Sequence, residues 1–215
     1  MTIIGFIACL GGDLGFAWAD TAAFSGPSNR PAGHVSKLTM NPLACLAGVR
    51  AGWNLLGREG ASVATEALTM DEAAEKLPGR LRQAAARAAS SFATQPETFA
   101  GNIFGLLGWS PSLRRVVGVR FDAHSYFAPC LATRLAEPHV DGLAALDPAS
   151  PFDVLGVAAA QLAALQRDLA EPITGDLVVA ELRPGAVATV VLPGFATRPA
   201  DLAGAPPVET AHGVH

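Results

Sequence analysis

The sequence predicts an α+β fold, because apolar residues recur with two different periods in separate stretches of the chain. Short apolar runs bounded by turn residues lie near both ends and after residue 102, and longer runs with helical spacing lie between them. With 215 residues, 50% of them hydrophobic, the chain can build one domain with a large core. We expect this domain to span residues 1–198 and the Ala-, Pro- and Gly-rich stretch 199–215 to form a flexible tail.

Strands are expected wherever a short apolar run is flanked by glycine, proline or small polar residues. These runs are residues 3–9, 14–19, 35–38, 43–47, 103–109, 115–122, 126–132, 177–182 and 186–192. Short turns such as 11–13 and 110–112 join neighbouring runs, so we expect antiparallel pairing. The segment 26–31, which is rich in glycine and proline, is expected to be a loop.

Helices are expected where apolar residues recur every three or four positions. They are residues 49–56 with 62–68, as one helix or a broken pair, then 69–92, and finally 152–168. Thr69 is a suitable cap for the second helix, and Pro78 should break its early part. The helix at 152–168 is apolar around most of its circumference and should be buried.

Composition excludes several classes of function. The net charge of −4 argues against a nucleic-acid surface, because such binding needs clustered Lys and Arg. The cluster Arg80, Arg82 and Arg87 is interpreted as a solvated helix face. No stretch reaches the roughly 20 apolar residues that span a bilayer, so we expect no membrane partner.

Three cysteines without CxxC spacing predict reduced core thiols and a cytoplasmic location. The apolar run 3–10 is short for a signal peptide and no Lys or Arg precedes it. His34, His124 and His139 lack metal-ligand spacing, so neither a metal nor another cofactor is expected.

Thr2 follows the initiator Met1 directly, and this position suits a nucleophile. Methionine aminopeptidase usually removes Met1 before a small residue, which would leave Thr2 with a free α-amine beside its hydroxyl. One residue would then carry both nucleophile and base. The reference pKa of an α-amine, about 7.7 to 8.0, suits proton transfer near neutral pH.

Four short motifs, in this order along the chain, resemble the proteasome β-subunit family of N-terminal-nucleophile hydrolases. They are Thr-Ile-Ile-Gly at 2–5, Ala-Asp at 19–20, Lys-Leu-Thr at 37–39 and Ala-Gly at 47–48. Arg-Asp at 167–168 is a further match near the end of the last helix. The resemblance covers residues 1–60 well and 152–195 in part.

The resemblance implies a four-layer αββα sandwich of two antiparallel sheets, although the chain has room for one helix fewer than the family has. It implies that Thr2 attacks an amide, that Lys37 lowers the effective pKa of Thr2, and that Asp20 pairs with that lysine. By the same resemblance, Asp168 orients the α-amine and the backbone N–H near Gly48 binds the oxyanion.

The chain departs from the family pattern at two places near the expected site. In the family the nucleophile lies four residues before the glycine that Gly5 matches, and this count falls on Met1. The shift of one residue predicts that Thr2 points away from Lys37 unless a bulge compensates. The segment 135–142 has no serine where the family has a supporting one.

Three functions therefore stay open: a threonine peptidase, a catalytically silent subunit with an assembly role, and a small-molecule amidase. We expect a homo-oligomer, either a ring or a dimer, whereas the small-molecule amidase would be a monomer or a dimer. A peptide or small amide is the expected substrate, and whether an ATPase cooperates is open.

Overall fold

Two five-stranded antiparallel sheets form the centre of the computed structural model, which describes residues 2–25, 30–92, 101–167 and 173–196. The first sheet has the order β10-β1-β2-β11-β12 and the second β5-β6-β7-β8-β9. The first comprises β1 (Ile4–Ala8), β2 (Gly15–Asp20), β10 (Arg134–Glu137), β11 (Leu177–Arg183) and β12 (Ala186–Leu192). The second comprises β5 (Leu38–Asn41), β6 (Leu46–Ala51), β7 (Ile103–Ser110), β8 (Arg115–Asp122) and β9 (Cys130–Leu131).

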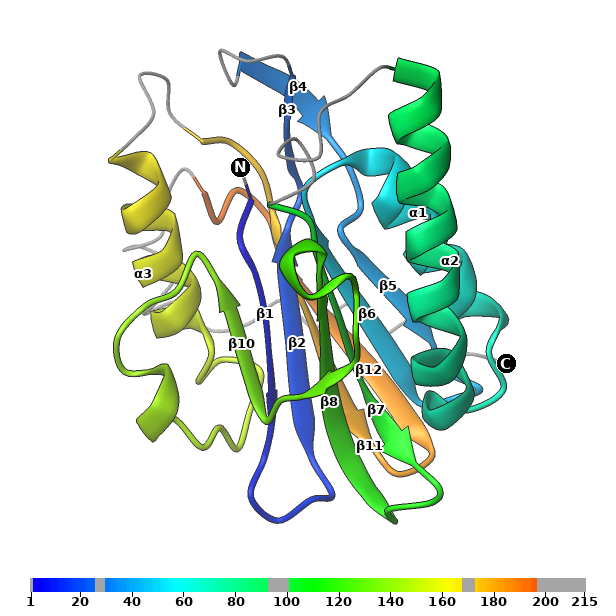
Figure 1. Ribbon diagram of the computed structural model, residues 1–215. Helices are drawn as coiled ribbons and strands as arrows, with labels where there is room; N and C mark the ends of the chain where they lie inside the picture. Colours follow the sequence, from blue (N-terminus) through cyan, green and yellow to red (C-terminus); the bar gives the residue numbers. More distant parts are fainter. Residues whose placement is uncertain (1, 26–29, 93–100, 168–172, 197–215) are drawn as a thin grey trace.

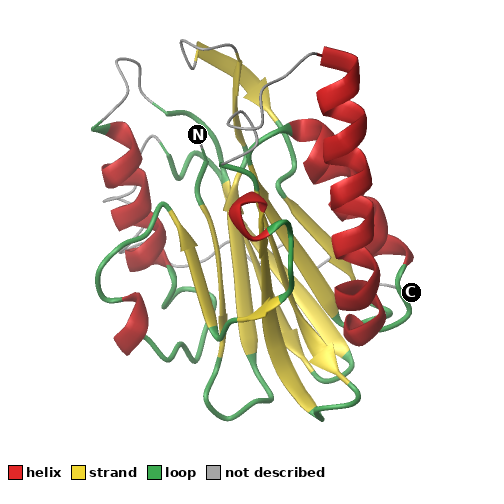
Figure 2. Ribbon diagram, viewed as in Figure 1, coloured by secondary structure: helices red, strands yellow, loops and turns green. Residues whose placement is uncertain are grey.

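Helices cover the outer faces of the sheets (Figures 1 and 2). α3 (Leu155–Gln166) lies against the first sheet, and α1 (Asn54–Glu66) and α2 (Met70–Phe92) lie against the second. A two-stranded ribbon of β3 (Ala22–Ser25) and β4 (Arg30–His34) extends from one end of the sheets. The predicted α+β class and the antiparallel pairing are confirmed.

Side-chain alternation along the strands separates the interior into three apolar clusters. Ile3 and Ile7 point toward α3, whereas Ile4 and Phe6 point between the two sheets. The third cluster joins α1 and α2 to the outer face of the second sheet around Phe104. Every layer of the fold is therefore held by its own buried apolar contacts.

Glycines let the two sheets approach closely around Phe6. A Cβ atom at Gly118 would lie 2.2 Å from the Phe6 ring, and one at Gly105 would lie 2.8 Å from it. Because both positions lack a side chain, the Phe6 ring fits between β7 and β8.

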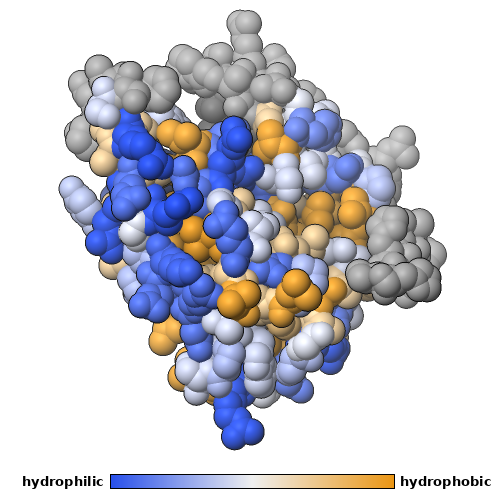
Figure 3. Space-filling model, turned by 90° about the vertical axis from the view of Figure 1, so that its right-hand side faces the viewer, coloured by the Kyte–Doolittle hydropathy of each residue, from blue (hydrophilic) through white to orange (hydrophobic). Residues whose placement is uncertain are grey.

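The outer face of α1 and α2 shows hydrophilic side chains gathered on one side and hydrophobic ones exposed across its middle (Figure 3). Arg80 and Arg87 both form ion pairs with Glu59 of α1. Two of the three arginines of the basic cluster are thus paired with a neighbouring helix, and their side chains stay exposed, as predicted for a solvated helix face.

Several local predictions were wrong. Residues 49–51 belong to β6 and not to a helix, since β6 pairs with both β5 and β7. Pro78 does not break the second helix, because α2 runs unbroken from Met70 to Phe92. Residues 30–31 of the expected loop 26–31 belong to β4, and its residues 26–29 lie outside the described part of the chain.

The cysteine prediction was also partly wrong. Cys9 and Cys45 are buried free thiols, but Cys130 is exposed on the short edge strand β9. Burial raises the pKa of the Cys9 thiol to about 11, so this thiol is inert near neutral pH. The expected tail at 199–215 lies outside the described residues.

Candidate functional site

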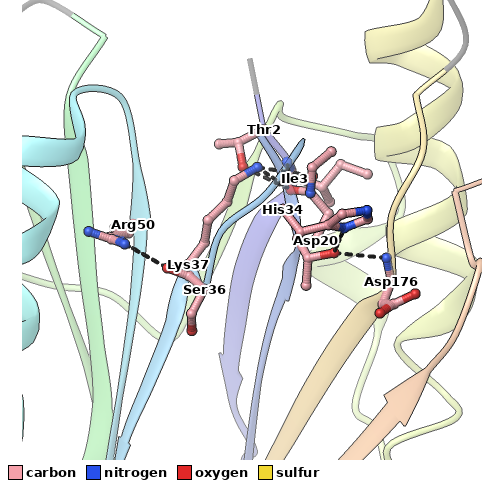
Figure 4. A network of polar contacts seen from close by, with 10 residues as sticks. Thr2, Ile3, Asp20, His34, Ser36, Lys37, Arg50 and Asp176 are labelled. Atoms are coloured by element: carbon pink, nitrogen blue, oxygen red, sulfur yellow. Dashed lines mark hydrogen bonds and ion pairs between the residues drawn. The ribbon is translucent and has the colours of Figure 1, made fainter. Parts of the chain in front are cut away.

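Asp20 is the centre of a buried polar network at the end of β2 (Figure 4). Its carboxylate is 1% exposed and accepts a hydrogen bond of 2.8 Å from the Thr2 hydroxyl. Lys37 Nζ donates to both carboxylate oxygens at 3.0 Å. The backbone N–H groups of Ile3 and Ala22 donate at 2.7 and 3.0 Å. The structure thus brings together Thr2, Asp20 and Lys37, three of the five predicted site residues.

These three residues come from both sheets. Thr2 lies just before β1 and Asp20 ends β2, whereas Lys37 precedes β5 in the second sheet. Lys37 extends the ladder of that sheet, because its carbonyl accepts a hydrogen bond of 3.1 Å from the N–H of Arg50. The ion pair between Lys37 and Asp20 therefore crosses from one sheet to the other.

The prediction that Thr2 points away from Lys37 was wrong. Ile3 faces α3 and Ile4 faces the space between the sheets, and side chains alternate along the extended chain. Thr2 therefore points to the same side as Ile4, toward the second sheet, where Lys37 lies. The Asp20 carboxylate accepts hydrogen bonds from both the Thr2 and the Lys37 side chains, so no bulge is needed to bring them together.

Burial lowers the pKa of Lys37 below its ordinary value. The negative charge of Asp20 opposes that shift, and the nearby cation Arg50 adds to it. The side chain of Lys37 is 9% exposed, so water screens these interactions little. The lysine is thus held as a desolvated cation beside a hydroxyl, which favours negative charge on a neighbouring oxygen.

Thr2 and Lys37 border a cleft of about 290 Å³. The cleft is also lined by Ala22, Ala23, Val35, Arg50, Ala51, Gly52, Trp53 and Asn54. A second cavity of about 310 Å³ shares Val35 and Lys37 with the first and adds Asp20 and His34. The first cleft therefore lies between Thr2 and the start of α1.

Gly48 lies in the middle of β6 and is not among the residues that line the cleft. A Cβ atom there would lie 3.0 Å from the Phe104 ring, so this position faces the helical layer. Gly52 does line the cleft, with a φ of +101°. Its N–H donates no hydrogen bond to another residue in the described part of the chain. The backbone at Gly52 therefore borders the cleft, whereas that at Gly48 does not.

Asn102 fixes the turn that carries Gly52. Its side-chain oxygen accepts a hydrogen bond of 2.6 Å from the N–H of Trp53. A Cβ atom at Gly52 would lie 2.4 Å from that same oxygen, so only glycine fits there. Sequence reasoning missed both residues; the Ala-Gly pair at 51–52, just before the helix, was the available signal.

A chain of polar contacts beside Asp20 was also missed. The Thr21 hydroxyl accepts a hydrogen bond of 2.9 Å from the N–H of Asp176 and lies 3.0 Å from His34 Nδ1. The Asp176 carboxylate accepts a hydrogen bond of 2.8 Å from the N–H of Gly194. These contacts connect the residue after β2 to β4 and to the residue before β11, at the end of the sheet that holds the site.

Asp168, the fifth predicted site residue, lies outside the described residues. Across residues 2–25, 30–92, 101–167 and 173–196, no three His, Cys, Asp or Glu side chains gather where a metal ion could be held. Of the helices in those ranges, none has the length and apolar character needed to cross a membrane.

Comparison with known proteins leaves the site to be interpreted from its own geometry. No protein-family model matches the chain, and no curated protein is similar to it.

Proposed function

We propose that the protein is an N-terminal-threonine hydrolase that cleaves a peptide or other amide bond. The observation that carries the proposal is the network of Thr2, Asp20 and Lys37, in which a hydroxyl beside a cleft shares a buried carboxylate with a lysine. The arrangement of two stacked antiparallel sheets between helices supports an N-terminal-nucleophile hydrolase fold.

The reaction requires that Thr2 be the first residue, after removal of Met1. Thr2 Oγ attacks the carbonyl carbon of the substrate, and the α-amine of Thr2 takes the hydroxyl proton. The C–N bond of the amide then breaks as the amine returns this proton to the leaving nitrogen. Water hydrolyses the resulting ester, and its attack releases the acid and restores the hydroxyl.

The other groups stabilise charge in this scheme. Lys37 favours the oxygen anion that forms as Thr2 gives up its proton, and Asp20 keeps the lysine in place. The N–H of Gly52 is the proposed donor to the oxyanion of the substrate, in place of Gly48. Before attack, the Thr2 hydroxyl has to turn from Asp20 toward the cleft.

The test is the intact mass of the purified protein before and after incubation with a β-lactone that acylates N-terminal threonine. Loss of Met1 and one adduct per chain are expected for the wild type and for Thr2→Ser, which keeps a hydroxyl. Thr2→Ala should remain unlabelled, although its fold should be intact. Lys37→Met should label more slowly by about 100-fold or more, as removal of one stabilising charge from an active site does.

A chain that loses Met1 but takes no adduct would refute the proposal and favour the silent subunit with an assembly role. Retention of Met1 in the active preparation would refute it as well. Where labelling succeeds, a fluorogenic peptide and a small anilide, assayed side by side, distinguish the peptidase from the small-molecule amidase.

A further inference from the structure

The last strand of the first sheet, β12, forms an open edge without a charged side chain (orange in Figure 1). Its seven residues, at 186–192, are Ala-Val-Ala-Thr-Val-Val-Leu and include neither proline nor glycine. Within the described ranges β12 pairs with β11 alone, so the backbone groups along its other side have no strand partner there. An uncharged edge of this kind readily accepts another strand.

The other three edges of the two large sheets are protected in ways that β12 is not. β5 and β10 have four residues each, and β9 has two. β10 also carries the charged residues Arg134 and Glu137. Short length and charge are common devices that keep a sheet edge from pairing with another chain. Of these four edges, β12 is therefore the one that can form a long ladder.

The turn before β12 determines which of its backbone groups point outward. Arg183 and Ala186 are partners across a two-residue turn, and residues that flank such a turn bond to each other. The direction of the N–H and C=O groups alternates along a strand, so those of the even-numbered residues of β12 face β11. The N–H and C=O groups of the odd-numbered residues, Val187, Thr189 and Val191, therefore point away from β11.

The order of residues in β12 is complementary to a second copy of itself that runs in the opposite direction. With the two copies of Thr189 opposite each other, Val187 lies opposite Val191, and Ala188 lies opposite Val190. Apolar and β-branched pairs of this kind stabilise neighbouring strands. The outward N–H and C=O groups of the odd-numbered residues then meet those of the second copy, so this register also completes the hydrogen-bond ladder.

Packing on both faces holds β12 in place and leaves its edge open. Val190 and Leu192 pack against the apolar cluster beneath α3, and Val187 packs against the cluster between the sheets. Val191 is nevertheless 38% exposed, and Thr189 is half-buried. The strand is thus already in the extended conformation that pairing needs, with apolar surface near its centre in contact with water.

We propose that two copies of the protein pair through β12, antiparallel about a twofold axis at Thr189, and so join their first sheets into one continuous sheet. This contact is isologous, so it closes as a dimer and differs from the head-to-tail contact of a ring. The lack of charge in β12 fits self-pairing, because a charge at its centre would face the same charge on the second copy. The pairing does not depend on the proposed hydrolase activity.

The first test is the mass of the protein in analytical ultracentrifugation, from about 1 μM to 1 mM, which spans the affinities of weak protein pairs. We expect the wild type to reach twice the mass of one chain. Thr189→Lys should raise the dissociation constant by about 100-fold or more, because two like charges would face each other on the axis. Leu131→Lys is the matched control, since Leu131 is 68% exposed on the edge strand β9, and it should keep the wild-type mass.

The second test is amide hydrogen exchange, followed residue by residue by NMR, which reads the geometry of the contact. The N–H groups of Val187, Thr189 and Val191 should be protected at high protein concentration and should exchange faster on dilution. Those of Ala188 and Val190 should stay protected at every concentration, because they bond to β11. In Thr189→Lys the first set alone should lose protection, and the second set then shows that the variant is folded.

Four results would overturn the proposal. They are a wild type that is monomeric at every concentration, a dimer that Thr189→Lys leaves intact, a dimer that Leu131→Lys dissociates to the same extent, and protection of the outward N–H groups that does not change with concentration. The last result, together with the mass of a single chain, would mean that another part of the same chain covers the edge. Because the exchange experiment uses the wild type, it decides the question even where Thr189→Lys does not fold.

Discussion

Replacement of Asp20 by asparagine tests whether the buried carboxylate holds the site together. The change keeps the shape of the side chain but removes its charge from a position that is 1% exposed. Four donors converge on this carboxylate, from Thr2, Ile3, Ala22 and Lys37. The amide of asparagine has one oxygen, so its NH₂ group would face donors where an acceptor is needed.

The largest expected loss comes from Lys37, whose ammonium would be left buried without a counter-ion. Removal of one partner from a buried ion pair typically costs about 3 to 5 kcal/mol. In a domain of this size, the melting temperature should fall by about 10 °C. Urea unfolding at pH 7, followed by tryptophan fluorescence, measures the loss, because Trp18 is fully buried in the first sheet.

The matched control is the double variant Asp20→Asn with Lys37→Met. It removes both charges, so a large part of the stability lost in the single variant should return. A loss below about 1 kcal/mol in Asp20→Asn would refute the reasoning, since that is the value of an exposed pair. A double variant less stable than Asp20→Asn would refute it as well.

Two further predictions concern the helices and the acid side of the pH profile. Gly60→Ala should destabilise the protein by about 1 to 3 kcal/mol, because the new Cβ atom would lie 2.3 Å from the buried Phe104 ring. Gly79→Ala is the control in the same urea assay. It should stabilise the protein by about 0.5 to 1 kcal/mol, because a Cβ atom at Gly79 would have no other atom within 4 Å. Backbone N–H groups before α3 donate to Asp153 and lower its pKa below 3.8, so its contribution is present above that value and is lost as the pH falls through the folded pKa. Asp153→Asn should therefore be less stable than the wild type at pH 7, by under about 1 kcal/mol, and equal to it in strong acid; a constant difference at all pH values would contradict this.

Much of the sheet structure was predictable from the sequence because its strands are short, apolar and bounded by turns. β7, β8, β11 and β12 lie within a residue of the predicted positions. The second half of β6 was not predictable in this way, because the apolar residues of 49–56 also have helical spacing. The residues of this half form a strand because they pair with β5 and with β7. The position of β5 was itself ambiguous in the sequence, and β7 is distant along the chain.

At Pro78 the burial of apolar side chains outweighs the cost of a proline inside a helix. The proline has no N–H to donate within α2, at a cost of about 3 kcal/mol. On both sides of it the same helix face is buried, including Leu77 and Leu81, against the second sheet. Burial of each such side chain stabilises by about 1.5 to 3 kcal/mol, so the continuous helix is favoured.

The candidate site was predictable in part, through motifs and not through geometry. Thr2, Asp20 and Lys37 were identified from the order of short motifs, and the structure brings them together. The wrong prediction that Thr2 points away from Lys37 came from counting residues back from Gly5. The direction of the Thr2 side chain depends instead on the alternation of side chains along the chain that leads into β1. Gly52 and Arg50 were missed because their roles depend on where α1 begins, which the sequence placed too early.

Because of the ion pair between Asp20 and Lys37, any activity of Thr2 would also depend on the completion of folding. The two partners belong to different sheets, so they meet only after the sheets have docked. Under the proposed mechanism, a newly synthesised chain, or one with its sheets apart, would hold a threonine without its activating lysine. Such a chain would not react with its neighbours during folding, and the proposed hydrolysis would begin only in the folded molecule.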